Sequence, residues 1–320
     1  MSYAEHAAGL DPIVRDVLDR MIALGIPRME DVGPVGAREQ FRRLVAARLV
    51  GTEPPVVGSV ETRVIDGPGG QLRLRIATPV GEGPWPLVVH LHGGGWTVGD
   101  IDSYDNTIRR LCRDVDAVVV SVDYRLAPEH PWPAGLDVAW AGLLWAVYSA
   151  DVLGADSRVG ITGDSAGAQL AASCTLRARD QGGPAITAQL LVVPSTTMVR
   201  LWPSYEDSGM GYGLDVPLMA WYGDNYVPDP DRRAGPETSP LEADSHADLP
   251  PAVIAVATHD PLRDQGLAYA DALQVAGVPV QLVVAEGQIH TFVGMAAIAP
   301  AAERAVGEAY AGFRRLLHPH

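Results

Sequence analysis

Short apolar runs alternate with helix-like segments through the middle of this chain. The apolar runs, each typical of a buried strand, read PLVVHLH, AVVVSVDY, RVGITG and AQLLVVPS in chain order. Between them the pattern predicts helices over 104–113, 136–148 and 166–179. Strands that alternate with helices form a parallel sheet with helices on both faces, because a parallel crossover needs the length of a helix. The sequence therefore predicts an α/β fold with a mainly parallel central sheet.

Further elements are expected on both sides of this region. Apolar residues recur at helical spacing over 11–49, interrupted by GIPRMEDVGPVG, which predicts two helices before the first strand. The alternating runs VETRVIDG and QLRLRIATP then predict an antiparallel hairpin at a sheet edge. Two late strands, PAVIAVATHD and PVQLVVAEG, precede a final helix over 301–317. The strand PVQLVVAE could pair across a dimer, or the terminal helix could cover it.

One segment does not fit the alternation. Residues 198–240 are rich in Trp, Tyr, Met, Gly and Pro, and they separate two core strands. The alternative to an insertion with its own helices is a structureless loop, but about 40 residues of loop would be unusual in a compact domain. We therefore expect residues 1–50 and 198–240 to form a helical cap. It would lie over the carboxyl edge of a core formed by 51–197 and 241–320, where open α/β sheets bind ligands.

Composition narrows the class of protein. The chain has 320 residues, 47% of them hydrophobic, and a formal net charge of −15, which disfavours nucleic acid and anionic membranes as partners. Its two cysteines, Cys112 and Cys174, suggest free buried thiols rather than a disulfide or metal site. We see no signal peptide and no apolar stretch long enough to span a membrane. We expect a cytoplasmic protein, without stable membrane insertion, that is a monomer or a homodimer.

The stretch ITGDSAGAQLAASC places Ser165 between Gly163 and Gly167, after a predicted strand and before a predicted helix. The three residues could simply mark a turn, since Gly and Ser are common there. A G-x-S-x-G sequence in this context also matches a sharp turn that exposes a nucleophile, with small neighbours because the backbone segments approach closely. The context favours the second interpretation.

A serine nucleophile needs a histidine base and an acid that orients it. His290 follows the last predicted strand, at the sheet edge where Ser165 should also lie. Asp260 follows the preceding strand, and the order Ser, Asp, His is typical of one class of α/β hydrolases. The rivals for the acid and base are Asp264, expected to be a helix cap or first-turn charge, and His259, expected to point away. The remaining candidates are expected to be structural or to lie in a frayed tail: His90, His92, His130, His318 and His320.

The sequence also contains a glycine loop that could stabilise negative charge on a reacting carbonyl. Gly93, Gly94 and Gly95 follow the strand PLVVHL, and the amide of Ala166 opens the helix after the serine. Backbone donors of this kind stabilise an oxyanion. A phosphate-binding loop is the rival interpretation, but no Gly-Lys-Ser/Thr follows.

These motifs together resemble the bacterial members of the hormone-sensitive lipase family of esterases. The resemblance is carried by HGGGW, VSVDYRLAPEHPWPA, GDSAGA, DPLRDQG and IHTF, in that order, and covers about 56–295. It implies an α/β-hydrolase fold with a two-part helical cap. It also implies Ser165 as nucleophile, His290 as base and Asp260 as orienting acid. The oxyanion donors that it implies are Gly94, Gly95 and Ala166, and it implies a scaffold role for the YRLAPEHPWPA stretch.

The chain departs from the family at three places. Ala168 stands where a second glycine usually follows the serine motif, so helix and strand should pack differently. After Val193 the family often has Tyr-Pro and a nearby aspartate, whereas this chain has VVPSTTM. The resemblance therefore does not specify the details of the acyl pocket or of its contact with the cap. Thr291 replaces the common glycine after the base. None of these changes removes a catalytic group.

We therefore expect a carboxylesterase that works through an acyl-enzyme, needs no metal or organic cofactor, and takes a small-molecule ester. The resemblance favours short to medium acyl chains. Aromatic and Met residues could line the substrate pocket or could simply pack the core: Trp96, Met198, Trp202, Tyr205, Met210, Trp221 and Tyr222. Two other classes of function stay open, a non-catalytic small-molecule receptor on the same fold, and a serine amidase, thioesterase or acyltransferase.

Overall fold

The computed structural model describes residues 9–319, which contain an eight-stranded sheet in the order β1-β2-β4-β3-β5-β6-β7-β8. The strands are β1 (Ser59–Gly67), β2 (Gly70–Thr78), β3 (Trp85–Leu91), β4 (Val118–Val122), β5 (Ala155–Asp164), β6 (Ala188–Val192), β7 (Ala252–His259) and β8 (Val280–Ile289). Strand β2 pairs antiparallel with β1 and with β4, and all other neighbours are parallel. This confirms the mainly parallel sheet and the hairpin at its edge.

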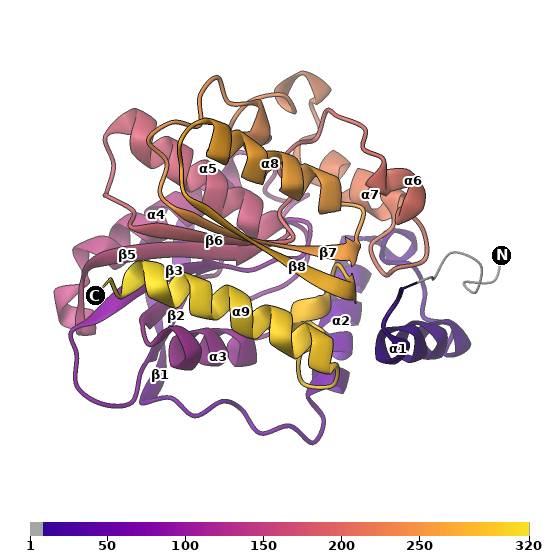
Figure 1. Cartoon of the computed structure of the whole chain (residues 1–320), viewed down its shortest axis with the longest axis horizontal. Coiled ribbons are helices and arrows are strands. Elements are labelled where there is room, and N and C mark those ends of the chain that lie inside the picture. Colours follow the sequence, from indigo (N-terminus) through magenta and orange to yellow (C-terminus); the bar gives the residue numbers. More distant parts are fainter. Residues whose placement is uncertain (1–8, 320) are drawn as a thin grey trace.

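Helices cover both faces of this sheet, as the alternation predicts. Figure 1 shows α4, α5 and α8 on one face and α3 and α9 on the other. Their bounds are α3 (Asp105–Val115), α4 (Ala134–Tyr148), α5 (Ala166–Gln181), α8 (Arg263–Val275) and α9 (Pro300–Leu317). Each helix buries an apolar stripe against the sheet; in α3 the stripe is Ile108, Leu111, Cys112 and Val115. The central strands β3 and β4 are buried almost throughout, while the edge strand β1 is largely exposed.

The remaining helices gather at the end of the sheet where the parallel strands finish (Figure 1). They are α1 (Pro12–Ala23), α2 (Met29–Leu49), α6 (Ser204–Asp207) and α7 (Val216–Tyr226). Helix α2 begins inside the stretch that the sequence pattern treats as an interruption, because the chain only kinks at Gly33, with φ +68°, before Pro34. Helices α6 and α7 lie within 198–240, so this segment is not a structureless loop.

Arg38 ties α2 to the core. Its guanidinium makes a two-pronged ion pair with Glu129 and also donates to the backbone oxygens of Thr97 and Ala127, at 2.8 and 2.9 Å. The hydrogen bond from Arg38 lowers the pKa of Glu129 to about 2. Glu129 therefore has a structural partner, in agreement with the scaffold role expected for its stretch.

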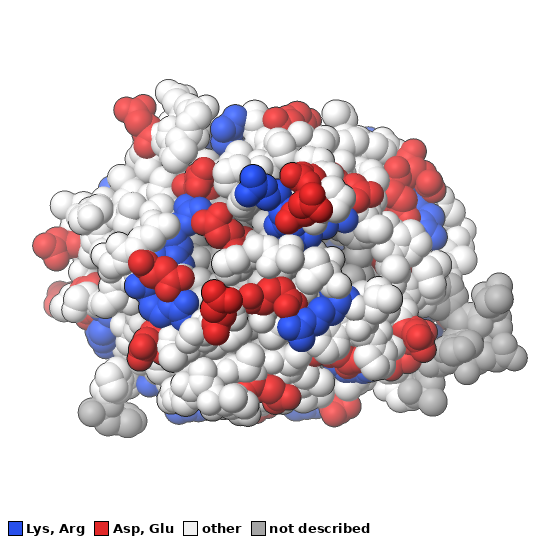
Figure 2. Space-filling view, turned by 90° about the horizontal axis from the view of Figure 1, so that it is seen from above, with Lys and Arg blue, Asp and Glu red and all other residues white. Residues whose placement is uncertain are grey.

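The described surface carries charges of both signs (Figure 2), and the two cysteines are free thiols, as the sequence suggested. Figure 2 shows acidic and basic side chains interspersed on one face, with no patch of a single sign. Cys112 and Cys174 are both buried and free, and burial raises the pKa of each thiol to about 12. No helix within residues 9–319 has the length and apolar character needed to cross a membrane.

Candidate active site

Ser165 lies at a sharp turn between β5 and α5. Its backbone is held at φ +55° and ψ −118°, a conformation that a non-glycine residue rarely adopts, and its N–H donates to the carbonyl of Val192 at 2.8 Å. The turn leaves the Ser165 side chain at the end of the strand, where it lines a cavity. This is the strand-turn-helix context that the G-x-S-x-G sequence predicts.

The two flanking glycines leave room for this turn. A Cβ at Gly163 would come within 2.4 Å of the Gly167 backbone, and a Cβ at Gly167 within 2.0 Å of the Leu91 oxygen. Both contacts are far closer than real side chains make, so glycine is required at each position by the approach of β3 and α5. Ala168, the residue that departs from the family pattern, is fully buried in the apolar core, so its methyl group is accommodated there.

The structure brings the predicted serine, histidine and aspartate together in one hydrogen-bonded chain. His290 Nε2 lies 2.9 Å from Ser165 Oγ, and His290 Nδ1 lies 2.8 Å from Asp260 Oδ2. Asp260 is fully buried at the end of β7, and its other oxygen accepts from the Leu262 N–H at 2.8 Å. Because a carboxylate only accepts, Nδ1 carries the imidazole proton and Nε2 is free to accept from the serine hydroxyl.

Three residues whose backbone amides are candidate oxyanion donors also line this cavity. Gly94, Gly95 and Ala166 line the cavity with Ser165, and their N–H groups have no hydrogen-bond partner within residues 9–319. Gly94 has φ +118° and its carbonyl accepts from Val98 at 2.9 Å, which turns the loop back on itself. Ala166 opens α5, so the positive end of the helix dipole adds to its amide. Unpaired donors of this kind can bind a developing oxyanion.

Two aromatic residues support the glycine loop. The ring of Tyr222, on α7, packs on Gly95, where a Cβ would come within 2.2 Å of the ring. Trp96 stacks on Tyr226 with ring centroids 4.5 Å apart, and its Nε1 donates to the Gln169 side-chain oxygen at 2.9 Å. The Gln169 amide in turn donates to the backbone oxygen of Glu237 at 2.7 Å. The loop is therefore fixed both by α5 and by the segment inserted between β6 and β7.

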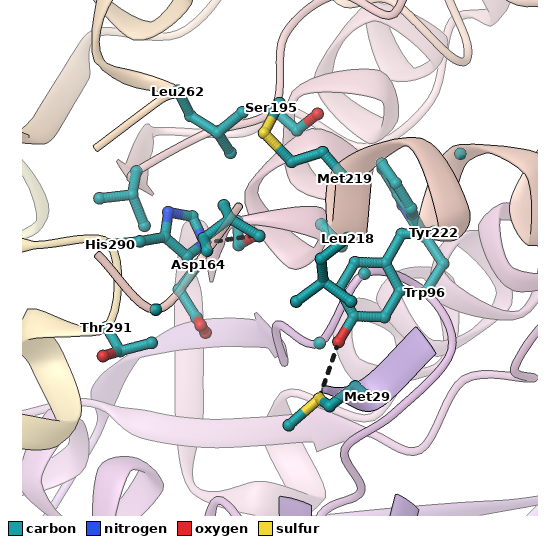
Figure 3. Close-up of a pocket in the computed structure, with 18 of the residues that line it drawn as sticks. Met29, Trp96, Asp164, Ser195, Leu218, Met219, Tyr222, Leu262, His290 and Thr291 are labelled. Carbon is teal, nitrogen blue, oxygen red and sulfur yellow. Dashed lines mark hydrogen bonds between the residues drawn. The ribbon is translucent and has the colours of Figure 1, made fainter. Parts of the chain in front are cut away.

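The cavity above Ser165 has a volume of about 460 Å³. Figure 3 shows His290 and Thr291 on one side and the apolar Leu218, Tyr222 and Trp96 on the other. The Tyr222 hydroxyl reaches the sulfur of Met29 at 3.3 Å, which joins α7 to α2 beside the cavity (Figure 3).

The pocket residues predicted from the sequence divide into two groups. Those that line the cavity are Trp96, Met198, Tyr205 and Tyr222. The other three candidates are absent from the lining of this cavity: Trp202, Met210 and Trp221. Trp221 lies one position, and so about 100° of helix, from Tyr222, and it turns away from the cavity. Trp202 packs half-buried against the core, and Met210 is 58% exposed.

Several cavity residues were missed. Leu218 and Met219 share one face of α7 with the predicted Tyr222, at a helical spacing that is present in the sequence. Asp164 and Tyr104 carried no such signal. The Tyr104 hydroxyl donates to Asp164 at 2.9 Å, and both groups accept from the Gly93 N–H at 3.1 Å. Burial raises the pKa of Asp164, and this network holds the start of the glycine loop beside the serine turn.

The rival acid and base do not reach Ser165. Asp264 lies in the first turn of α8 and accepts from the Ser204 N–H at 2.8 Å and from Arg263 at 2.8 Å. His259 stacks on Tyr212 with centroids 5.2 Å apart, and burial lowers its pKa.

The other histidines are held by the fold. His90 and His92 are buried in and after β3, and His130 contacts Arg125 through Nδ1 at 2.6 Å. A frayed tail was expected at His318, but its side chain is held in place: Nε2 lies 3.0 Å from the Val115 backbone oxygen. His320 lies outside the described residues.

The unusual VVPSTTM stretch has its own contacts. Ser195 lines the cavity, and the N–H groups of Thr196 and Thr197 donate to the Gln265 side-chain oxygen at 2.6 and 3.1 Å. Thr291, the other departure, also lines the cavity. Within residues 9–319, no group of three or more His, Cys, Asp or Glu side chains is arranged to hold a metal ion.

Comparison with known proteins agrees with this geometry. A family model described as alpha/beta hydrolase fold matches residues 88–294. The esterase LipI of Mycobacterium tuberculosis is 40% identical over 320 residues, which cover 98% of each chain. The carboxylesterase NlhH of that organism is 42% identical over 244 residues, or 75% of this chain and 76% of that protein. A solved hyperthermophilic esterase from the archaeon Pyrobaculum calidifontis, 35% identical, matches with a TM-score of 0.92 over 97% of this chain and 99% of its own. The chain therefore belongs to the alpha/beta hydrolase fold family, among the esterases that resemble hormone-sensitive lipase.

Proposed function

We propose that this protein hydrolyses carboxylic esters through a covalent acyl-enzyme, with Ser165 as nucleophile, His290 as base and Asp260 as the acid that orients it. The observation that carries the proposal is the unbroken chain of hydrogen bonds, 2.9 Å from Ser165 Oγ to His290 and 2.8 Å from His290 to Asp260. Ser165 and His290 line a cavity to whose lining Gly94, Gly95 and Ala166 also belong.

Acylation follows from the proton positions. His290 Nε2 takes the Ser165 proton as Oγ attacks the ester carbonyl carbon, and Asp260 stabilises the imidazolium that forms. The carbonyl oxygen becomes an oxyanion that the amides of Gly94, Gly95 and Ala166 bind. Each such donor contributes about 2.7–4 kcal/mol to the transition state. The C–O bond then breaks, and Nε2 returns the proton to the leaving alcohol.

Deacylation repeats these steps with water. His290 removes a proton from the water, the hydroxide attacks the acyl carbon, and Ser165 Oγ leaves with the proton from Nε2. The carboxylic acid product is released and the enzyme is restored. The steps use groups that this chain supplies itself.

We also propose that the substrates have short to medium acyl chains. Support comes from the cavity of about 460 Å³, which is in the range of sites for small ligands. The measurement is kcat/KM for p-nitrophenyl esters of increasing acyl length. We expect a maximum at short or medium chains, and a maximum at long chains would contradict the proposal.

The nucleophile is tested with two serine variants, because Ser165 and Ser195 both line the cavity. We expect Ser165→Ala to lose ester hydrolysis and covalent labelling by a fluorophosphonate, with an unchanged fold by circular dichroism. Ser195→Ala should keep the label. If the wild-type protein is labelled but does not hydrolyse esters, the activity is that of an amidase, a thioesterase or an acyltransferase, and turnover of matched substrates would identify which. If Ser165 is not labelled, the protein is better explained as a small-molecule receptor.

The domain division and the cellular context belong to the same proposal. We infer that 1–50 and 198–240 form a cap on a core of 51–197 and 241–320; the contacts of Arg38 and Tyr222 support this division. We infer a cytoplasmic monomer or homodimer that binds no nucleic acid, on the net charge of −15 and the two buried free thiols. Size-exclusion chromatography with light scattering measures the oligomeric state.

A further inference from the structure

Arg48 is a cation in the wall of the cavity. The chain has no lysine, so its 24 basic residues are all arginines. Arg48 lies in the last turn of α2 and lines the cavity, and within residues 9–319 its guanidinium has no carboxylate and no hydrogen-bond acceptor. The other two arginines of the lining differ, since Arg200 pairs with Glu242 and Arg233 with Asp224, each at 2.7 Å.

The guanidinium of Arg48 lies beside Gly294. A Cβ at Gly294 would come within 2.9 Å of Arg48 Nη1, so the glycine leaves space for the guanidinium. Gly294 belongs to the short helix η5 (Phe292–Met295), directly after His290. Tyr104 lies near Arg48, and its hydroxyl donates to Asp164 beside the nucleophile. Arg48 therefore lies in the part of the cavity beside η5, the short helix that follows His290 in the chain.

The lining contains more basic than acidic side chains, although two of its three arginines are ion-paired. The chain carries a net charge of −15, yet the lining contains three arginines and a single acidic residue, Asp164. Asp164 is partly buried and accepts hydrogen bonds from the Tyr104 hydroxyl and the Gly93 N–H. Burial without a partner lowers the pKa of Arg48, because a desolvated cation is destabilised until an anion joins it.

We propose that Arg48 binds a carboxylate carried by the substrate, so that the preferred substrates are esters with a second, free carboxylate group. This inference rests on the proposed esterase function and specifies its substrate class. The guanidinium can bind a carboxylate through two parallel N–H···O bonds, which gives orientation as well as affinity. The carboxylate can belong to the acyl part, in a half-ester of a dicarboxylic acid, or to the alcohol part, in an ester of a hydroxy acid.

The test compares charged and neutral esters of matched size. For the acyl side the pair is monoethyl adipate and ethyl hexanoate, followed by pH-stat. For the alcohol side the pair is 4-acetoxybenzoate and 4-acetoxybenzamide, followed by chromatography of the released phenol. We expect wild-type kcat/KM to favour the charged member of at least one pair, and the favoured pair identifies which part carries the carboxylate.

Variants assign the preference to Arg48. Arg48→Gln should lower kcat/KM for the favoured charged ester by roughly 10- to 100-fold, the usual worth of a charge-assisted hydrogen bond, and leave the neutral ester within about twofold. Arg48→Lys should restore part of the loss. Arg43→Gln is the matched control, since Arg43 lies on the same helix, is exposed and pairs with Glu39 outside the cavity.

Three results would overturn the inference: neutral esters preferred in both pairs, equal losses for charged and neutral esters in Arg48→Gln, or an equal loss in Arg43→Gln. Failure of the esterase function itself would look different. In that case wild-type protein would hydrolyse none of the four esters in a manner that depends on Ser165.

Discussion

Gly167 lies against the backbone oxygen of Leu91, so closely that a Cβ at Gly167 would come within 2.0 Å of that oxygen. The contact joins the first turn of α5 to the end of β3. It fixes the position of the nucleophile turn relative to the glycine loop, which begins two residues after Leu91.

Gly167→Ala should therefore destabilise the fold. The added methyl group would have to push apart two backbone segments, since His92 O is also only 2.5 Å from the Cβ position. We expect a loss of at least about 2 kcal/mol in the free energy of unfolding, measured by urea denaturation. Gly307→Ala, in α9, is the control: nothing lies within 4 Å of its Cβ, so it should stabilise by about 0.4–1 kcal/mol. Equal effects of the two changes would contradict the argument.

Asp260→Asn should keep the fold and lose most of the activity. The amide could donate to His290 and hold the imidazole in the tautomer that cannot accept from Ser165. We expect kcat to fall on the order of 10³- to 10⁴-fold, measured with a p-nitrophenyl ester. The control is Asp264→Asn, which loses contacts to Ser204 and Arg263 but none to His290. If Asp264→Asn lost as much kcat as Asp260→Asn, the assignment of the acid would be wrong.

His90 should make stability depend on pH. Burial lowers its pKa from 6.5 to about 3, and its Nδ1 lies 2.9 Å from Ser121 Oγ. Below pH 6.5 the unfolded chain gains a proton that the folded protein does not, so stability falls as the pH decreases toward 3. From pH 8 to pH 5 this histidine lowers the free energy of unfolding by about 2 kcal/mol.

The check is urea unfolding of wild type and His90→Asn at both pH values. Asparagine can place an oxygen near the Nδ1 position and does not titrate. We expect the drop in stability between pH 8 and pH 5 to be about 2 kcal/mol smaller in the variant, whatever its absolute stability. The lowered pKa of buried His92 acts in the same direction and leaves a residual dependence. An unchanged difference between the two pH values would rule out the role of His90.

Tyr222→Ala should enlarge the apolar end of the cavity and release the ring that packs on Gly95. We expect the optimum acyl length of p-nitrophenyl esters to move to longer chains, with a severalfold lower kcat for acetate. Trp221→Ala removes the neighbouring aromatic ring, which does not line the cavity, and should leave the optimum length unchanged. If Trp221→Ala moved the optimum acyl length as far as Tyr222→Ala, the effect would come from a change in α7 as a whole, and the specific role of Tyr222 would be contradicted.

The sheet was predictable because its strands alternate with helices in the sequence, and the places of Ser165, Asp260 and His290 at strand ends follow from the same pattern. Strand alternation and the glycines around Ser165 have a direct physical cause in burial and close approach. Asp260 and His290 each follow a strand, and parallel strands bring their carboxyl ends together. Their meeting is thus a consequence of topology rather than of any contact visible in the sequence.

The pocket was harder to predict because its residues come from many separate segments. Composition suggested both Trp221 and Tyr222, but the helical phase of α7 places only Tyr222 of the two, together with Leu218, in the lining of the cavity. Arg48 and Tyr104 lie far apart in the chain, and their approach depends on where α2 packs. The kink at Gly33 shifts that helix without leaving any periodic signal.

Gln169 uses both ends of its amide, accepting from Trp96 and donating to the backbone of residue 237. An apolar residue at 96 would leave a buried oxygen without a donor, and a different backbone course at 237 would leave a buried N–H without an acceptor. A chimaera that transplants the inserted segment from a relative must therefore carry a matching pair at these places. Exchanging that segment alone in order to change the substrate specificity would alter the pocket and would also disturb the contacts that support the glycine loop.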